Sequence, residues 1–162
     1  MARALIVGCG CRGRSLGRAL IDSGWAVRGT SRTPEGRAEI ERAGLEPAAA
    51  DPDRAGTIIE FVGDVAVVVW ALGSADGDAE ALDALHGPRL ERVLGHLVDT
   101  PVRGFVYEGE GSAGGERLDR GWEIVEASSR TWRIPAIRLD ADPADHAEWV
   151  RAAERAVNAV IA

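Results

Sequence analysis

The stretch ALIVGCGCRGRSLGRAL, residues 4–20, decides the fold. An apolar run leads directly into GCGCRG, residues 8–13, which matches the pattern G-x-G-x-x-G. The glycines follow a predicted strand at 3–7 and open a predicted helix at 13–23, which is the context that this pattern requires. In such loops the first glycine makes a tight turn, the second lets the backbone approach a pyrophosphate, and the third lets the helix pack closely on the strand. N–H groups at the start of the helix then face the phosphate, so the stretch predicts a nucleotide-binding loop.

Short apolar runs alternate with longer amphipathic stretches along the rest of the chain. The run VAVVVWAL at 65–72 is nearly all apolar, which indicates a strand buried on both faces, as in a parallel sheet. Strands that alternate with helices predict an α/β fold: a single doubly wound Rossmann domain over residues 1–162, with a mostly parallel sheet of about six strands and no separate substrate domain. The predicted strands are 3–7, 26–31, 45–50, 65–72, 102–107 and 134–139, and the predicted helices are 13–23, 33–43, a short one ending near 61, 78–85, 88–98, 118–131 and 143–161.

Composition narrows the classes of function. The formal net charge of −7 argues against a broad nucleic-acid-binding surface, and no apolar stretch reaches the roughly 18 residues of a membrane span. The first loop glycine comes at residue 8, too early for a signal peptide, and two cysteines do not make a disulfide framework. We therefore expect a cytoplasmic protein. All 19 basic residues are arginine, so every mechanism that needs a lysine is excluded.

Cys9 and Cys11 occupy the variable positions of the glycine loop, where they are either a redox or metal pair or small spacers. A C-x-C pair supplies at most two ligands, whereas a structural zinc site needs four, and the three histidines show no ligand spacing. We interpret both cysteines as small, mostly buried spacers and expect no metal. A redox role would require a thiolate of lowered pKa, which a helix N-terminus can promote.

The end of the second predicted strand distinguishes between cofactors. An acidic side chain there, about 20 residues beyond the glycines, would favour NAD. The chain has Thr30, Ser31, Arg32 and Thr33 instead, and Arg32 is placed to pair with a 2′-phosphate while the hydroxyls donate hydrogen bonds to it. The sequence therefore predicts NADP, with NAD as the second choice. Arg12, within the loop, is either a phosphate ligand or a solvated side chain.

At this level of detail the sequence resembles the atypical and extended short-chain dehydrogenase/reductase superfamily, especially compact NAD(P)-binding relatives of nucleoside-diphosphate-sugar epimerases. The segments that carry the resemblance span roughly residues 3–112: ALIVGCGCRGRSLGRAL (4–20), VRGTSRTPE (27–35), GLEPAAADPDR (44–54), VAVVVWALG (65–73) and VRGFVYEGEGS (102–112). The resemblance implies that Asp51 approaches the adenine amino group and that Ala71, Leu72 and Gly73 line the ribose side. With the loop and the second strand, the expected cofactor-binding residues are Gly8, Gly10, Cys11, Arg12, Gly13, Ser31, Arg32, Thr33, Asp51, Ala71, Leu72 and Gly73.

The chain departs from the family at its catalytic pair. The family uses a tyrosine and a lysine four residues later, but the chain has one tyrosine, Tyr107, no lysine, and glycine at position 111. The C-terminal substrate-binding region of the epimerases is also missing from these 162 residues. Glu108, as a base, and Ser112, as a substrate ligand, are the other catalytic candidates, because both follow the fifth predicted strand. The interpretation that we favour for this segment is a solvent-facing acidic loop.

Three hypotheses remain at this stage. The chain binds a dinucleotide without catalysis, as a redox sensor or a regulatory protein with a protein partner; it is an oxidoreductase or epimerase-like enzyme with a non-standard site after the fifth strand; or it is a scaffold that binds no nucleotide. The last predicted helix carries an apolar stripe, which we expect to pack on the sheet or in a homodimer. The stripe consists of Trp149, Ala152, Ala153, Ala156, Val157 and Val160.

Overall fold

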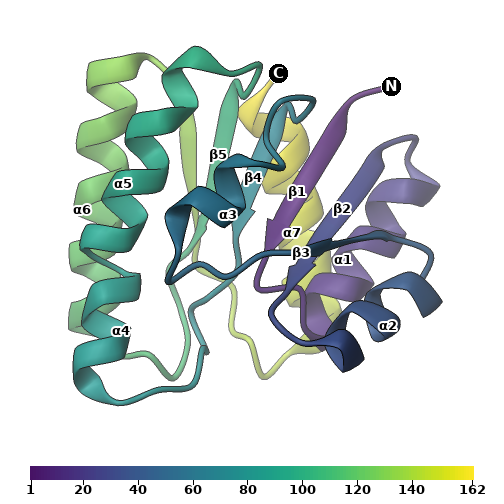
Figure 1. Cartoon of the computed structure of the whole chain (residues 1–162), viewed down its shortest axis with the longest axis horizontal. Helices are drawn as coiled ribbons and strands as arrows, with labels where there is room; N and C mark the ends of the chain where they lie inside the picture. The colour runs from purple at the N-terminus through teal and green to yellow at the C-terminus, as the bar shows by residue number, and fades with distance from the viewer.

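Six parallel strands lie side by side in the order β3-β2-β1-β4-β5-β6 in the computed structural model, which describes residues 1–162 (Figure 1). The predicted α/β class and doubly wound topology are confirmed, and the sheet is entirely parallel. The strands are β1 (Arg3–Val7), β2 (Ala26–Ser31), β3 (Glu46–Ala49), β4 (Val67–Trp70), β5 (Gly104–Glu108) and β6 (Ala136–Leu139). The helices are α1 (Cys11–Asp22), α2 (Pro34–Arg42), α3 (Ala55–Ile59), α4 (Ala79–Leu85), α5 (Pro88–His96), α6 (Gly115–Trp132) and α7 (His146–Val160), with a 3-10 turn at Leu97–Asp99.

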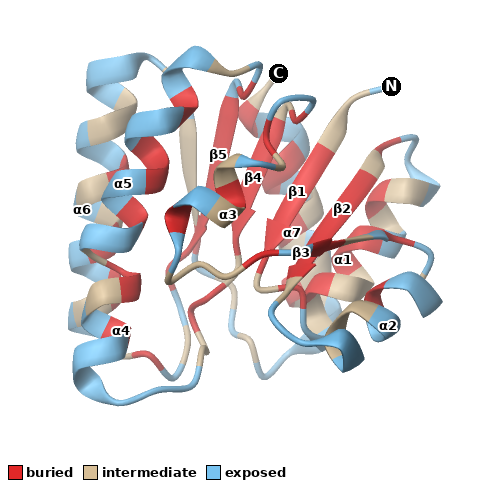
Figure 2. Cartoon of the chain, viewed as in Figure 1, coloured by how far each residue is buried: buried red, intermediate tan, exposed pale blue.

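Helices cover both faces of the sheet, so the strands are buried on both sides (Figure 2). Alternate residues of β1 point to opposite faces: Ala4 and Ile6 pack with α1, α2 and α7, whereas Leu5 and Val7 pack with α3 to α6. The apolar stripe of α7 belongs to the first of these two cores, where Trp149 and Ala153 are buried. The expectation that this stripe packs on the sheet is confirmed.

Local sequence explains several boundaries of the elements. Pro47 is tolerated in β3 because β3 is an edge strand that pairs only with β2. The break that Gly87 and Pro88 predict between two helices is confirmed, since α5 begins at Pro88. At α2, Thr33 is the N-cap and accepts a hydrogen bond from the Gly36 amide, with Pro34 at the first position.

Three predicted boundaries were wrong by a functionally relevant margin. The segment 108–116 was predicted to be loop throughout, but Glu108 is the last residue of β5 and α6 begins at Gly115 rather than at 118. The chain turns into α6 early because Gly114, the N-cap, has a φ of 106°, which a glycine adopts without strain. Helix α1 likewise begins at Cys11, inside the glycine motif, rather than at residue 13.

Candidate functional site

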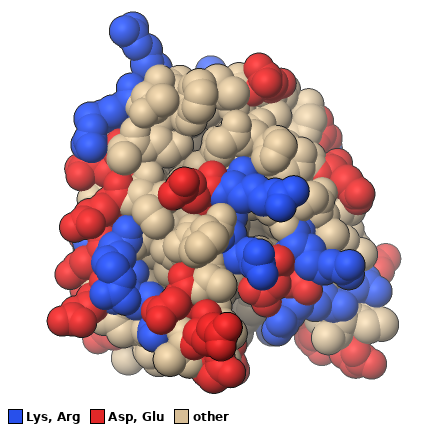
Figure 3. All heavy atoms as spheres, turned by 60° about the vertical axis from the view of Figure 1, so that its left-hand side comes forward, with Lys and Arg blue, Asp and Glu red and all other residues tan.

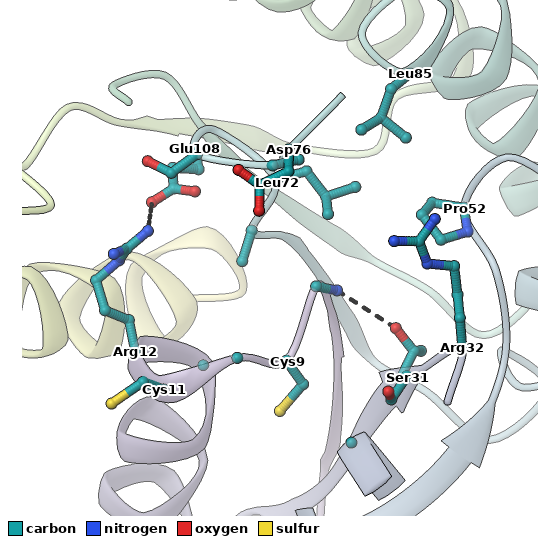
Figure 4. Close-up of a pocket in the computed structure, with 18 of the residues that line it drawn as sticks. Cys9, Cys11, Arg12, Ser31, Arg32, Pro52, Leu72, Asp76, Leu85 and Glu108 are labelled. Atoms are coloured by element: carbon teal, nitrogen blue, oxygen red, sulfur yellow. Dashed lines mark hydrogen bonds and ion pairs between the residues drawn. The ribbon is translucent and has the colours of Figure 1, made fainter. Parts of the chain in front are cut away.

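A cleft of about 510 Å³ opens at the carboxyl ends of the central strands, where β1 and β4 are neighbours and the chain connections diverge to either side (Figure 4). In open parallel sheets this is the place where ligands bind. Its wall includes most of the residues that the sequence predicted for a cofactor: Gly8, Gly10, Cys11, Arg12, Gly13, Ser31, Arg32, Ala71 and Leu72. Three predicted residues, Thr33, Asp51 and Gly73, do not line it.

The three glycines of the motif have different surroundings. Gly8 has a φ of 85°, and a Cβ on it would lie 2.6 Å from the Ala71 carbonyl oxygen. A Cβ on Gly13 would lie 3.3 Å from the Gly8 carbonyl oxygen, so the helix start packs closely on the strand end. A Cβ on Gly10 would meet no atom within 4 Å. The protein's own packing therefore requires Gly8 and constrains Gly13, whereas the space over Gly10 is open to the cleft.

The start of α1 carries an unusual concentration of positive charge. Its N-cap is Gly10, which supplies no side-chain hydrogen bond, and its first turn contains no acidic residue. Arg12 and Arg14 lie in that turn and both line the cleft. Helix N-termini favour anionic side chains because the first N–H groups are unpaired and the dipole is positive there. No acidic side chain in its own first turn compensates this end of the helix, which suits an external anion.

Arg32 stands at the other end of the cleft, near Pro52 (Figure 4). Arg32 directly follows β2, and its side chain is exposed and makes no ion pair. Ser31 lines the cleft beside it, and its hydroxyl oxygen accepts a hydrogen bond from the Thr33 amide at 3.3 Å. Thr33 itself is occupied as the cap of α2, which explains why it does not face the cleft. Thr30 is buried, and its hydroxyl oxygen accepts a hydrogen bond from the Gly8 amide at 3.3 Å.

The turn after β3 places neighbours of Asp51, rather than Asp51 itself, in the wall of the cleft. The Asp51 carboxylate accepts a hydrogen bond from the Asp53 amide at 2.9 Å, which closes the turn on itself. Pro52 and Asp53 line the cleft instead, and Asp76 does so from the loop after β4. Sequence reasoning missed Asp53 and Asp76; their positions in the connections that follow two parallel strands were the signal that could have identified them.

Glu108 is fully buried at the end of β5, so the interpretation of its carboxylate as solvent-facing was wrong. Its Oε1 accepts a hydrogen bond from the Gly73 amide and its Oε2 accepts one from the Trp149 indole Nε1, both at 2.7 Å. The Arg12 guanidinium lies 3.9 Å from Oε2 (Figure 4). Burial raises the pKa of Glu108, and the Gly73 amide, the charge of Arg12 and the Trp149 N–H each oppose that rise.

Tyr107 lies in the hydrophobic core on the α3–α6 side of the sheet and does not line the cleft. Its hydroxyl is 2.7 Å from Nδ1 of the buried His86, whose Nε2 lies 3.0 Å from the Leu72 carbonyl oxygen. Because a carbonyl only accepts, Nε2 carries the ring proton and Nδ1 accepts from the tyrosine. Burial raises the pKa of Tyr107 and lowers the pKa of His86, so both are held neutral.

Ser112, the remaining catalytic candidate, and the nearby Glu110 are exposed in the connection between β5 and α6. They line a second, more open hollow of about 460 Å³, together with Asp142 from the loop before α7. Arg12 and Ser74 line both this hollow and the main cleft, so the two spaces adjoin at these side chains.

The two cysteines of the loop differ in their exposure to solvent. Cys9 is buried, as predicted, and burial raises the pKa of its thiol to about 12. Cys11 is exposed at the start of α1, so the interpretation of it as a buried spacer was wrong. Within the described residues, 1–162, no group of three or more His, Cys, Asp or Glu side chains is arranged to hold a metal ion.

The outer surface gives less information about function. On the face drawn in Figure 3, acidic and basic side chains are interspersed rather than gathered into one basic surface. None of the helices combines the length and the apolar character that are needed to span a lipid bilayer.

Comparison with known proteins shows the fold. A short-chain dehydrogenase/reductase superfamily protein from Agrobacterium tumefaciens with bound NAD matches with a TM-score of 0.69 and 21% identity, over 85% of this chain and 48% of that one. UDP-glucose 4-epimerase of Thermotoga maritima, with UDP-glucose, matches with a TM-score of 0.71 and 12% identity, over 85% and 54%. Triphenylmethane reductase of Citrobacter sp., complexed with NADP(H), matches with a TM-score of 0.65 and 18% identity, over 84% and 48%.

These matches span most of this chain but about half the length of the solved structures. No protein-family model matches the chain, and no curated protein matches it in sequence. At this level of identity the structures establish architecture alone. The chain therefore has the Rossmann-type fold that is found in short-chain dehydrogenases/reductases and sugar-nucleotide epimerases.

Proposed function

We propose that the chain binds a dinucleotide in the cleft over the glycine loop, and that it prefers NADP(H) to NAD(H). The observation that carries the proposal is the open space over Gly10 at the positively charged start of α1. No protein atom lies within 4 Å of a Cβ placed there, and no acidic side chain in the first turn neutralises the helix terminus. A diphosphate that approaches the backbone at this point would satisfy both features.

The size of the cleft and the fold support the same proposal. A volume of about 510 Å³ is within the range of about 300–1,000 Å³ that is typical of small-molecule sites. Two of the structures that share the fold were solved with NAD or with NADP(H). The cofactor would be held by the loop glycines, Arg12, Ser31 and Arg32, with Ala71 and Leu72 along its side.

Arg32 is the basis for preferring the phosphorylated cofactor. It follows β2 and is exposed, with no ion pair, so its charge is available to a ligand. The residues that end β2 include no acidic side chain to bind a ribose 2′-hydroxyl. An arginine beside a 2′-phosphate forms a charge-assisted pair that NAD lacks.

We further propose that binding, rather than the chemistry of the Tyr–Lys pair, is the role of this chain, in a redox-sensing or regulatory protein. The chain has no lysine, and its one tyrosine is buried against His86 outside the cleft. The alternative, an oxidoreductase or epimerase-like enzyme, is favoured by the open hollow that adjoins the cleft at Arg12 and Ser74. That hollow offers room for a second molecule beside a bound cofactor.

Calorimetric titration with NADPH and with NADH tests the proposal. We expect NADPH to bind more tightly, and Arg32→Ala to weaken NADPH binding about tenfold while changing NADH binding little, because one charge-assisted pair is lost. Arg103→Ala is the matched control, since Arg103 is also exposed but lies before β5, at the opposite end of the strands. Failure of both nucleotides to bind at millimolar concentration would contradict the proposal.

A second measurement separates binding from catalysis. NADPH absorbance is followed with the protein and a panel of aldehydes, ketones and sugar nucleotides. Binding without oxidation supports the regulatory role, whereas protein-dependent oxidation supports the enzyme.

A further inference from the structure

Glu108 joins three elements that are distant in the sequence. Its two oxygens accept from the Gly73 amide, after β4, and from the Trp149 indole of α7. Two N–H donors therefore face one carboxyl group that is 0% exposed. A glutamine here would turn an NH₂ group toward one of those donors, so the arrangement selects a carboxylate. A buried carboxylate requires a compensating charge, and Arg12, at 3.9 Å from Oε2, is the cation that lies beside it.

Arg12 is held in place but its hydrogen-bonding capacity is unused. Its guanidinium carbon lies 5.5 Å from the centre of the Trp149 ring, which is a cation–π contact, and its charge faces Glu108. None of its N–H groups makes a hydrogen bond within the protein, and its Nε is buried without a partner. A guanidinium has five N–H donors, so this side chain is oriented by neighbours that leave its donors free.

The position of Arg12 fits a second anionic group of the ligand. In Figure 4 Arg12 rises from the start of α1 at one end of the cleft, and Arg32 stands at the other end. A dinucleotide with a 2′-phosphate carries anionic groups at two separate places, the ribose and the diphosphate. Arg32 faces the first place under the proposed function, and Arg12, beside the open backbone of Gly10, is the cation with unused N–H donors near the second.

We infer that Glu108 and Trp149 together position Arg12 as a specificity-determining residue that reads the diphosphate of the dinucleotide, so that the cleft distinguishes the whole dinucleotide from its adenosine half. The inference rests on the proposed function. Glu108 itself is a positioning residue under this inference, because it acts through Arg12: its two oxygens are engaged by the Gly73 amide and the Trp149 indole N–H, and Arg12 lies beside Oε2.

Two ligands, the wild type and three variants test this role. NADPH and adenosine 2′,5′-bisphosphate, which lacks the second phosphate and the nicotinamide half, are titrated into wild type, Arg12→Ala, Glu108→Gln and the double variant. Arg12→Ala is expected to weaken NADPH binding about tenfold and to change bisphosphate binding much less, since a charge-assisted contact to the second phosphate is lost. Arg18→Ala is the control, because Arg18 lies on the same helix, pairs with Asp22 and does not line the cleft.

The double variant separates positioning from general damage to the fold. Glu108→Gln is expected to weaken NADPH binding severalfold in the wild-type background and to have no further effect when Arg12 is already alanine. Trp149→Phe provides a milder second route, because it removes the N–H that Oε2 accepts but keeps a ring under Arg12. Thermal unfolding confirms that each variant is folded at the temperature of titration.

The outcomes distinguish this inference from the function on which it rests. If Arg12→Ala weakens the binding of both ligands equally, or of neither, the role of Arg12 is overturned. The proposed function still stands in that case if Arg32→Ala weakens NADPH binding. Additive effects of Glu108→Gln and Arg12→Ala would overturn the positioning role of Glu108. Failure of the wild type to bind NADPH at all would overturn both.

Discussion

Two glycine-rich loops lie at the same edge of the sheet, and only one has the properties of an anion site. Residues 8–10 join β1 to α1, and residues 109–114 join β5 to α6. Both lead into a helix whose N-cap is a glycine without a side-chain hydrogen bond. The first turn of α6 contains Glu116, which complements the helix dipole, whereas the first turn of α1 contains Arg12 and Arg14 and no acid.

The difference teaches that glycine content alone does not identify a binding loop. Gly109 and Gly111 are glycines because neighbours leave no room: a Cβ on either would lie within 2.5 Å of Arg138 or of the Gly73 backbone. Arg117, near the start of α6, is already paired with Asp83 at 2.7 Å. The start of α6 is thus compensated by Glu116 and Asp83, whereas the start of α1 has no acidic residue in its first turn and has Glu108, from β5, beside Arg12.

The largest expected effect is that of Gly8→Ala, which tests how far the β1–α1 loop is itself fixed by packing. The new methyl group would meet the Ala71 carbonyl oxygen at 2.6 Å, and the φ of 85° disfavours any side chain. Backbone strain and overpacking together predict a loss of about 3 kcal/mol in the free energy of unfolding. Urea denaturation measures the change, and a loss below about 1 kcal/mol would show that the loop relaxes easily.

Gly10→Ala is expected to have a smaller effect on stability and a selective effect on binding. Its methyl group enters open space, so the free energy of unfolding should fall by about 1 kcal/mol or less, chiefly through a poorer N-cap. The same methyl group would occupy the space that we assign to the diphosphate, and NADPH binding should weaken about tenfold or more.

The start of α6 supplies the matched control for this variant. Gly115 is also at a helix start, and a Cβ on it would meet no atom within 4 Å. Gly115→Ala should therefore leave NADPH binding unchanged by calorimetric titration. Equal effects of the two variants on NADPH binding would remove the distinction between the loops.

Local sequence was sufficient to predict those elements whose structure depends on the residues of a single segment. The strands at 3–7 and 26–31 were predicted to the residue, because apolar runs ending in glycine or in polar residues mark them clearly. Most of the residues that were predicted from the glycine motif and from the end of β2 do line the cleft, since a parallel sheet brings strand ends to one edge.

The burial of Glu108 could not be predicted in this way. Its partners Gly73 and Trp149 lie 35 and 41 residues away in the sequence, and only the completed fold brings them together. Tyr107 is similar, since its partner His86 lies on the turn between α4 and α5. A polar residue in a glycine-rich context resembles a solvated loop until distant donors are known to surround it.

The smallest effects are expected from two substitutions that exchange the electrostatic character of the two helix starts. Arg14→Glu places an acid in the first turn of α1, where the dipole favours it, and should raise the free energy of unfolding of the unliganded protein by about 0.3–1 kcal/mol. The same charge should repel a diphosphate and weaken NADPH binding. Glu116→Gln, the complementary change on α6, should lower stability by a similar amount and leave NADPH binding unchanged.

These two variants separate stability from binding most directly. Suppose that a bound anion compensates the arginines of α1. The stability that Arg14→Glu gains in urea denaturation without ligand should then disappear or reverse with saturating NADPH. The reason is that the wild type binds NADPH more tightly and is therefore stabilised more by it. A gain that persists unchanged with NADPH would mean that Arg14 does not contribute to the anion site. The compensation at α1 would then depend on Arg12 and the backbone amides alone.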